Sequence, residues 1–265
     1  MTAVAAVPSE ALDGARPLSI AVLAMGGQGG GVLVDWIVAL AESQGWAAQS
    51  TSVPGVAQRT GATVYYIECL PLPPGAPPPV LSMMAVPGEV DMVIGAELME
   101  AGRAIQRGLV TPDRTTLIAS SHRAYAVAEK QAPGDGIGDP GAVYAAARAA
   151  ARNFIAFDMA ALAEEAGSAI SAVLFGALAA VEVLPFPRTA YEATIRAAGI
   201  GVESSLRGFS RGYERSAVEQ RGGQPSPPPA AAALKQTPPL APVGHPEFDA
   251  LVAAPWRSSR PPLTA

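Results

Sequence analysis

Cysteine and lysine are both scarce in this sequence. The 265 residues contain a single cysteine, Cys69, which can form neither an internal disulfide nor the set of thiolates that an iron-sulfur cluster requires. We expect Cys69 to be a buried strand thiol in a reducing compartment. Only Lys130 and Lys235 are lysines among 18 basic residues, and the formal net charge is -5. Because no basic field is available to hold a phosphate backbone, nucleic acid is not an expected partner.

Long apolar runs are also missing. The N-terminal residues 1–17 carry Glu10 and Asp13 and lack the apolar core of a secretory signal, so we interpret them as a ragged leader. The most apolar later segment, residues 169–181, is too short to cross a bilayer and is followed by Glu182 and Pro185. It is predicted to be a buried helix. We therefore expect a cytoplasmic protein with no membrane partner.

What the sequence does contain is an alternation of short apolar runs and helical patterns. Runs typical of strands occupy residues 18–25, 46–53, 63–70, 90–96, 115–121 and 153–158. Helical spacing occupies residues 32–45, 97–108, 142–152 and 159–167, and Asp158 is placed to cap the last of these helices. Residues 168–220 are typical of three helices, broken at "LPFP" and "AGIG". This pattern predicts an α/β fold of three layers, in which helices cover both faces of a mostly parallel or mixed sheet and the C-terminal third is helical.

A change of composition near residue 221 divides the chain. Residues 18–220 form the predicted domain, whereas residues 221–265 are so rich in proline and alanine that we interpret them as a disordered tail or linker. His245 lies in that tail and is expected to be solvated. His122, which follows a strand, is only a slightly better site candidate.

The first motif with chemical content is a glycine-rich loop between the first strand and the first helix, formed by Gly26, Gly27, Gln28, Gly29 and Gly30. Such glycines allow a tight turn and present N–H groups at a helix N-terminus, where an anion is favoured. In a dinucleotide-binding fingerprint the third glycine would stand at position 32, where this chain has Val32, and a carboxylate would end the second strand, where this chain has none. A triphosphate-binding loop would have a lysine after the glycines, which is also missing. Both kinds of nucleotide site are therefore disfavoured. Two interpretations stay open: a turn needed for packing, or a loop that meets an anionic ligand or a partner, with Gln28 pointing into an interface or a cleft.

The second motif consists of Gln58, Arg59, Thr60 and Gly61, on a loop that precedes the third strand. A guanidinium offers a planar fork suited to carboxylate or phosphate, and the amide and hydroxyl beside it can bond a carbonyl or hydroxyl group. Because both loops follow the carboxyl ends of strands, we expect them to converge at one edge of the sheet. The alternative is a solvated arginine beside a turn.

The segments "MGGQGGGVLVDWIVALAESQG" and "VPGVAQRTGATVYYIE", which carry the two motifs, together resemble the gamma-type domain of the 2-oxoacid:ferredoxin oxidoreductases. The likeness is strongest to the beta subunit of indolepyruvate ferredoxin oxidoreductase, and residues 175–214 extend it over residues 18–219. Gly26, Gly27, Gln28 and Gly29 match the first loop of that family, and Gln58, Arg59 and Gly61 match the second. Thr60 stands where glycine or serine is often found, and Gly30 lengthens the glycine run.

The resemblance implies an accessory subunit that is not catalytic alone. A larger partner subunit would carry thiamine diphosphate with Mg and [4Fe-4S] clusters, decarboxylate a 2-oxoacid such as indolepyruvate or pyruvate, reduce ferredoxin and transfer the acyl group to coenzyme A. This chain would bind no metal or cofactor by itself, and no catalytic residue is assigned. Its two loops would contact the partner, coenzyme A or the thiamine site, and we favour the partner interface.

Two other functions stay open at this point. The chain could be a stand-alone Rossmann-like nucleotide-binding oxidoreductase, or a scaffold whose glycines serve packing alone.

Longer members of the family continue into another helical domain after a linker resembling "GHPEFDALVAA", so we expect this chain to be shortened relative to them.

Overall fold

Strand β1 (Leu18–Ala24) lies inside a sheet whose order is β2-β3-β1-β4-β5-β6. The computed structural model of the chain describes residues 16–53, 63–124 and 139–222. The other strands are β2 (Trp46–Val53), β3 (Thr63–Pro71), β4 (Met92–Gly95), β5 (Thr116–Ser120) and β6 (Asn153–Phe157). Strands β1, β4, β5 and β6 are parallel, whereas β3 is antiparallel to both β1 and β2. The predicted α/β fold is confirmed, and its sheet is of the mixed kind.

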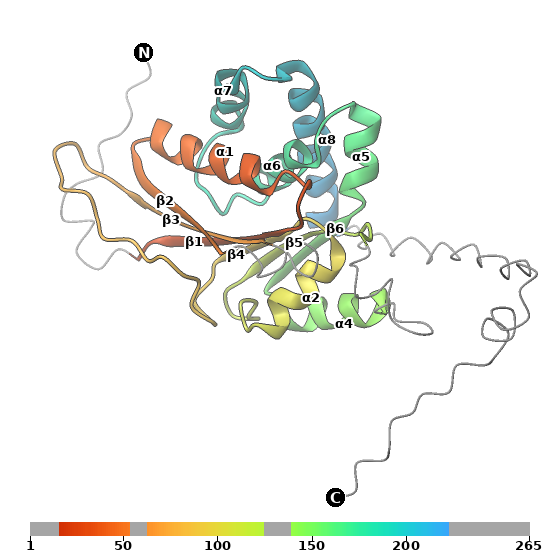
Figure 1. The fold of residues 1–265 in the computed structure, drawn as a ribbon. Helices are drawn as coiled ribbons and strands as arrows, with labels where there is room; N and C mark the ends of the chain where they lie inside the picture. The colour runs from red at the N-terminus through yellow and green to blue at the C-terminus, as the bar shows by residue number, and fades with distance from the viewer. Residues whose placement is uncertain (1–15, 54–62, 125–138, 223–265) are drawn as a thin grey trace, which may run out of the picture. The chain divides into compact units, whose positions relative to one another are not determined.

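The helices form a layer on each face of the sheet (Figure 1). One layer contains α1 (Gly30–Ser43), α5 (Met159–Ala166), α6 (Ile170–Ala180), α7 (Arg188–Ala198) and α8 (Val202–Gln220). The other contains α2 (Leu98–Gln106) and α4 (Pro140–Ala150). The helices in these residues were predicted in number and approximate position along the chain, including the breaks that separate α6, α7 and α8, but not in their assignment to one face or the other.

Alternation along β1 builds the two halves of the core. Ile20 and Val22 pack into the cluster that contains buried residues of α1 and α6, whereas Ala21 and Leu23 pack into the cluster beneath α2 and α4. Successive side chains of a strand point to opposite faces, so an apolar run without polar interruptions is required here. The central strand is therefore covered on both sides.

Two local predictions are confirmed in the second half of the chain. The Asp158 carboxylate accepts a hydrogen bond of 2.9 Å from the backbone N–H of Ala161 and so caps α5. Helix α6 is buried along almost its whole length. In the described ranges no single helix is long and apolar enough to cross a membrane, and α5 and α6 meet such a test only as a pair bent by 116°. The predicted leader and tail lie outside the described residues, except for their innermost positions.

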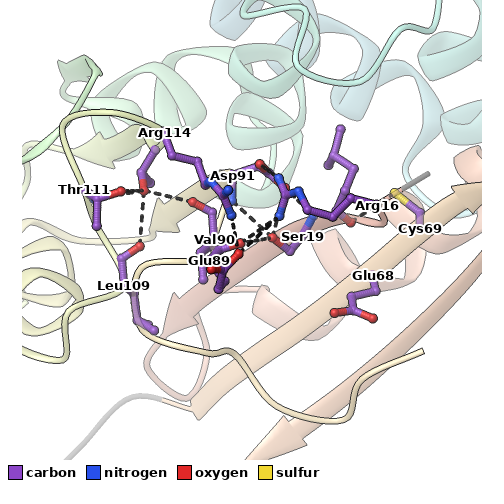
Figure 2. A network of polar contacts seen from close by, with 12 residues as sticks. Arg16, Ser19, Glu68, Cys69, Glu89, Val90, Asp91, Leu109, Thr111 and Arg114 are labelled. Atoms are coloured by element: carbon purple, nitrogen blue, oxygen red, sulfur yellow. Dashed lines mark hydrogen bonds and ion pairs between the residues drawn. The ribbon is translucent and has the colours of Figure 1, made fainter. Parts of the chain in front are cut away.

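A polar network ties the amino-terminal ends of β1 and β4 together (Figure 2). The Asp91 carboxylate accepts hydrogen bonds from the backbone N–H of Ser19 at 2.9 Å and from the Ser19 hydroxyl at 3.0 Å, and it pairs with Arg16. The Ser19 hydroxyl also donates to the Glu89 carbonyl at 2.8 Å, and Glu89 pairs with Arg114. This network lies at the opposite edge of the sheet from the glycine-rich loop.

Candidate functional site

The glycine-rich loop is a tight turn that closes on itself. The backbone N–H of Gln28 donates to the Met25 carbonyl at 3.1 Å, and the Gln28 side-chain oxygen accepts from the Met25 N–H at 2.8 Å. Gly27 and Gly29 have φ angles of 88° and 69°, which other residues adopt only with strain. The bond made by the Gln28 side chain was not expected from the sequence. It gives that amide an internal role in shaping the turn.

Two helix N-termini meet at this turn. Helix α1 begins after Gly29 and helix α6 begins after Ala169, and neither first turn has a side-chain cap or an acidic residue. A Cβ placed on Gly29 would lie 3.2 Å from the Cβ and hydroxyl oxygen of the buried Ser171. Because helix N-termini carry partial positive charge and unsatisfied N–H groups, their meeting favours an anion at this turn.

The turn also marks a switch point of the sheet. After β1 the chain passes to α1 on one face, and after β4 it passes to α2 on the other face (Figure 1). The backbone N–H of Ala96 donates to the Leu23 carbonyl at 2.9 Å, so the two departing segments are adjacent. Crevices at such points, outside the carboxyl ends of parallel strands, are where open α/β sheets bind ligands. Gly26 and Gly27 are exposed there, with nothing within 4 Å of an added Cβ.

The strands that flank the second motif in the sequence, β2 and β3, have their facing ends at the same edge of the sheet as the glycine-rich turn. Strands β1 and β2 point in the same direction because both are antiparallel to β3. Ala24 is paired with Thr63, and Val53 is paired with Val64, so Val53 and Thr63 both lie at the edge of the sheet from which the glycine-rich turn departs. Gln58, Arg59, Thr60 and Gly61 themselves lie outside the described residues.

Gly30 explains why the glycine run continues into α1. A Cβ at this position would lie 2.7 Å from the Ala24 Cβ and 2.8 Å from Cε2 of Tyr65, closer than atoms normally approach. A Cβ on the neighbouring Gly31 would lie 3.8 Å from the Tyr65 hydroxyl, which is an ordinary contact. The first turn of α1 therefore packs directly against β1 and β3, and this contact fixes the position of the glycine-rich turn.

A buried carboxylate, which sequence reasoning did not single out, follows β4. Glu97 is fully buried, and its side chain accepts from the Glu100 N–H at 2.9 Å to cap α2. Burial raises the pKa of Glu97, and the nearby Glu100 carboxyl raises it further, against the effects of backbone hydrogen bonds and Arg123. Glutamate is not among the residues that usually cap helices, so the sequence pattern offered no specific signal for this cap.

His122 joins the end of β5 to the start of α5. Its Nδ1 lies 2.7 Å from the Ser120 hydroxyl oxygen, which in turn accepts from the Met159 N–H at 3.0 Å. Burial lowers the pKa of His122, so the imidazole is neutral at pH 7. The histidine thus has a structural position at the carboxyl edge of the sheet. His245 lies outside the described residues.

Cys69 is buried in β3, as predicted. Burial, together with the charges of Asp91 and Glu68, raises the pKa of its thiol to about 12. Within residues 16–53, 63–124 and 139–222 there is no group of three or more histidine, cysteine or acidic side chains that could hold a metal ion.

Comparison with known proteins identifies relatives of this fold. A family model described as pyruvate ferredoxin/flavodoxin oxidoreductase matches residues 19–215. Pyruvate oxidoreductase subunit PORC from Thermotoga maritima is 20% identical, with a TM-score of 0.53 over 76% of this chain and 97% of that one. The gamma subunit of keto/oxoacid ferredoxin oxidoreductase from Geobacter sulfurreducens is 17% identical, with a TM-score of 0.51 over 76% and 99%.

A third solved structure is 2-oxoglutarate:ferredoxin oxidoreductase from Magnetococcus marinus, with 2-oxoglutarate, coenzyme A and succinyl-CoA bound. It is 14% identical, with a TM-score of 0.52 over 77% of this chain and 32% of that longer one. At these levels of identity the three likenesses establish a shared fold. None of the curated proteins compared matches the chain significantly.

Proposed function

The chain belongs to the pyruvate ferredoxin/flavodoxin oxidoreductase family and is thus part of an oxidoreductase, and we propose that it is the gamma-type accessory subunit of a 2-oxoacid:ferredoxin oxidoreductase. In the proposed reaction a 2-oxoacid and coenzyme A give an acyl-CoA and carbon dioxide, while oxidised ferredoxin takes up the electrons. A larger subunit supplies thiamine diphosphate with Mg and the [4Fe-4S] clusters. This chain, with its single cysteine, has no ligand set for such a cluster.

The observation that carries the proposal is the turn at residues 26–29. Two helix N-termini without side-chain caps meet there, and Gly26 and Gly27 leave the backbone open to close approach. That arrangement suits the phosphate groups of coenzyme A or a backbone segment of the larger subunit. In this role Gly26, Gly27 and Gly29 expose backbone N–H groups, while Gln28 holds the turn in shape through Met25.

We further propose that the 2-oxoacid is an arylpyruvate such as indolepyruvate and that the enzyme works in the cytoplasm. The support for the substrate is the resemblance of the paired sequence motifs to the beta subunit of indolepyruvate ferredoxin oxidoreductase. The relatives of similar fold act on pyruvate and 2-oxoglutarate, so these two acids are the natural competitors to test. No observation favours a stand-alone nucleotide-binding enzyme.

The test is reconstitution with the larger subunit from the same organism. We expect reduction of ferredoxin or a viologen dye that depends on a 2-oxoacid, on coenzyme A and on both subunits, with the highest kcat/KM for indolepyruvate among indolepyruvate, pyruvate and 2-oxoglutarate. Full activity of the larger subunit without this chain would refute the accessory role. A higher kcat/KM for pyruvate would refute the arylpyruvate specificity alone.

A further inference from the structure

Residues 72–88, which connect β3 to the segment before β4, form an irregular connection of unusual length and composition. They contain no charged residue and no histidine, and prolines occur at positions 73, 74, 77, 78, 79 and 87. Connections of this length without secondary structure are uncommon inside compact domains and are usually either functional loops or linkers. We call residues 72–88 the uncharged segment.

The uncharged segment is fastened to the sheet on the face turned away from α1 (Figure 1). The Glu68 carboxylate, on β3, accepts a hydrogen bond of 2.6 Å from the Ser82 N–H and another of 2.6 Å from the Tyr66 hydroxyl. The Thr51 hydroxyl, on β2, donates to the Met83 carbonyl at 2.6 Å. Glu68 is itself buried, so these bonds attach Ser82 and Met83 of the segment to the sheet at defined positions.

This fastened segment nevertheless presents apolar side chains to solvent. Val80, Met83, Met84 and Val86 are 100%, 68%, 64% and 51% exposed. Val53 is 51% exposed and shares a strand face with Thr51, which bonds to Met83. These five residues, which we call the apolar patch, account for five of the eight large hydrophobic side chains that are exposed in the described ranges.

Strand β2, next to the apolar patch, is an edge strand without the features that usually protect such strands. Strand β2 is terminal in the sheet and carries no charge and no proline over residues 46–53. Its backbone partners among the described residues lie on β3. Soluble proteins usually protect exposed edge strands with charges, prolines or a covering element. An edge that the described residues leave unprotected, beside an apolar patch, indicates a surface that is covered in the assembled protein.

We propose that the apolar patch docks against an uncharged, apolar face of the larger, thiamine diphosphate-binding subunit. This inference rests on the proposed function. Interface centres are depleted in charged residues and enriched in methionine, whose flexible side chain adapts to a partner. Val53 also ends β2 at the edge where the glycine-rich turn follows β1, so the patch continues the surface proposed to meet coenzyme A or the larger subunit. The uncharged segment is thus a preformed docking element.

The test compares two doubly substituted chains for binding to the immobilised larger subunit from the same organism. Met83→Glu/Met84→Glu places two charges in the patch, whereas Ile200→Glu/Val218→Glu places two charges on exposed apolar positions elsewhere. We expect the first variant to bind at least about tenfold more weakly than the unmodified chain, and the control to bind within about twofold. Equal unfolding midpoints for all three chains exclude loss of fold as the cause.

Each other outcome overturns a specific statement. If the unmodified chain binds and Met83→Glu/Met84→Glu binds equally well, the patch is not the docking surface and the accessory role stands. If the unmodified chain does not bind the larger subunit at all, the accessory role falls, and the docking proposal falls with it. If the two charges only convert a dimer of this chain into a monomer, as light scattering would detect, the patch joins two copies and the proposal is wrong.

Discussion

At the scale of single residues, Gln28 separates a packing role of the turn from an anion-binding role. Gln28→Glu keeps an oxygen acceptor for the Met25 N–H and adds a negative charge at the start of α1, where the helix dipole favours it. We therefore expect unchanged or slightly higher stability. In the reconstituted enzyme the KM for coenzyme A should rise by about fivefold, because a repulsion of about 1 kcal/mol between two charges about 4 Å apart corresponds to that change.

Gln44 provides the matched control for this substitution. It follows the last residue of α1, so Gln44→Glu makes the same chemical change at the other end of the same helix. We expect it to leave the KM for coenzyme A unaltered. If Gln28→Glu also leaves that KM unaltered, the turn serves packing alone, and the scaffold interpretation of the glycines is correct.

Cys69 gives a prediction about the dependence of stability on pH. Its folded pKa is raised to about 12, against about 8.5 for an unfolded thiol. A raised folded pKa means that the stabilising contribution is complete below the unfolded pKa and is lost as the pH rises towards the folded pKa. Between about pH 9 and pH 11 the unfolded chain releases this proton and the folded chain does not, which costs up to about 1.4 kcal/mol per pH unit.

The measurement is the free energy of unfolding of the unmodified chain and of Cys69→Ala at several values of pH. Above about pH 9 we expect the free energy of unfolding to fall more steeply with pH for the unmodified chain than for Cys69→Ala. This difference in slope does not depend on how far the two free energies differ at neutral pH. Comparing slopes removes the contribution of other alkaline groups, such as Tyr66, whose pKa is also raised by burial. Parallel curves would show that the thiol is accessible to water in the folded state.

At the scale of secondary-structure elements, the packing of α6 on α8 depends on the absence of side chains. A Cβ on Gly212 would lie 2.1 Å from the Val173 carbonyl oxygen, and a Cβ on Gly176 would lie 2.0 Å from the Phe209 carbonyl oxygen. Neither backbone can move without separating the two helices. Gly212→Ala is therefore expected to lower the free energy of unfolding by about 3 kcal/mol.

Gly102→Ala in α2 is the comparison for this substitution. Its Cβ would meet the Val143 methyl groups at 3.4 Å, an ordinary contact, and alanine is favoured over glycine in a helix interior by up to about 1 kcal/mol. We expect urea denaturation to show no loss of stability for Gly102→Ala. A similar loss in both variants would mean that the α6–α8 interface is looser than these distances indicate.

The elements themselves were largely predictable because the chain marks their ends. Gly45, Gly167 and Gly199 adopt positive φ angles after α1, α5 and α7, and each stood at the end of an apolar pattern. Strand direction was less accessible. Period and composition indicate that residues 63–70 form a strand, but the nine residues between Val53 and Thr63 are compatible with more than one pairing, and the antiparallel register of β3 is set by tertiary packing.

At the scale of the whole molecule, the sequence located the glycine-rich turn but not its surroundings. The turn follows from glycines between a strand pattern and a helix pattern. The approach of α6 to Gly29 joins residues more than a hundred positions apart, and the cap made by Glu97 depends on burial that one glutamate does not indicate. The apolar patch was also missed, because prolines in residues 72–88 predicted only the end of a strand.

The two edges of the sheet are expected to have separate roles, and Asp91 tests this division. Asp91→Ala removes the acceptor of the Ser19 N–H, which is buried, and so should lower the free energy of unfolding by about 1–3 kcal/mol. Because this network lies at the amino-terminal edge (Figure 2), the KM for coenzyme A should not change in enzyme that remains folded. Gln28→Glu should show the opposite pattern, with stability kept and the KM raised. If Asp91→Ala raised that KM as much as Gln28→Glu does, the site would depend on the whole sheet, and the glycine-rich turn could not be the element that contacts the anion.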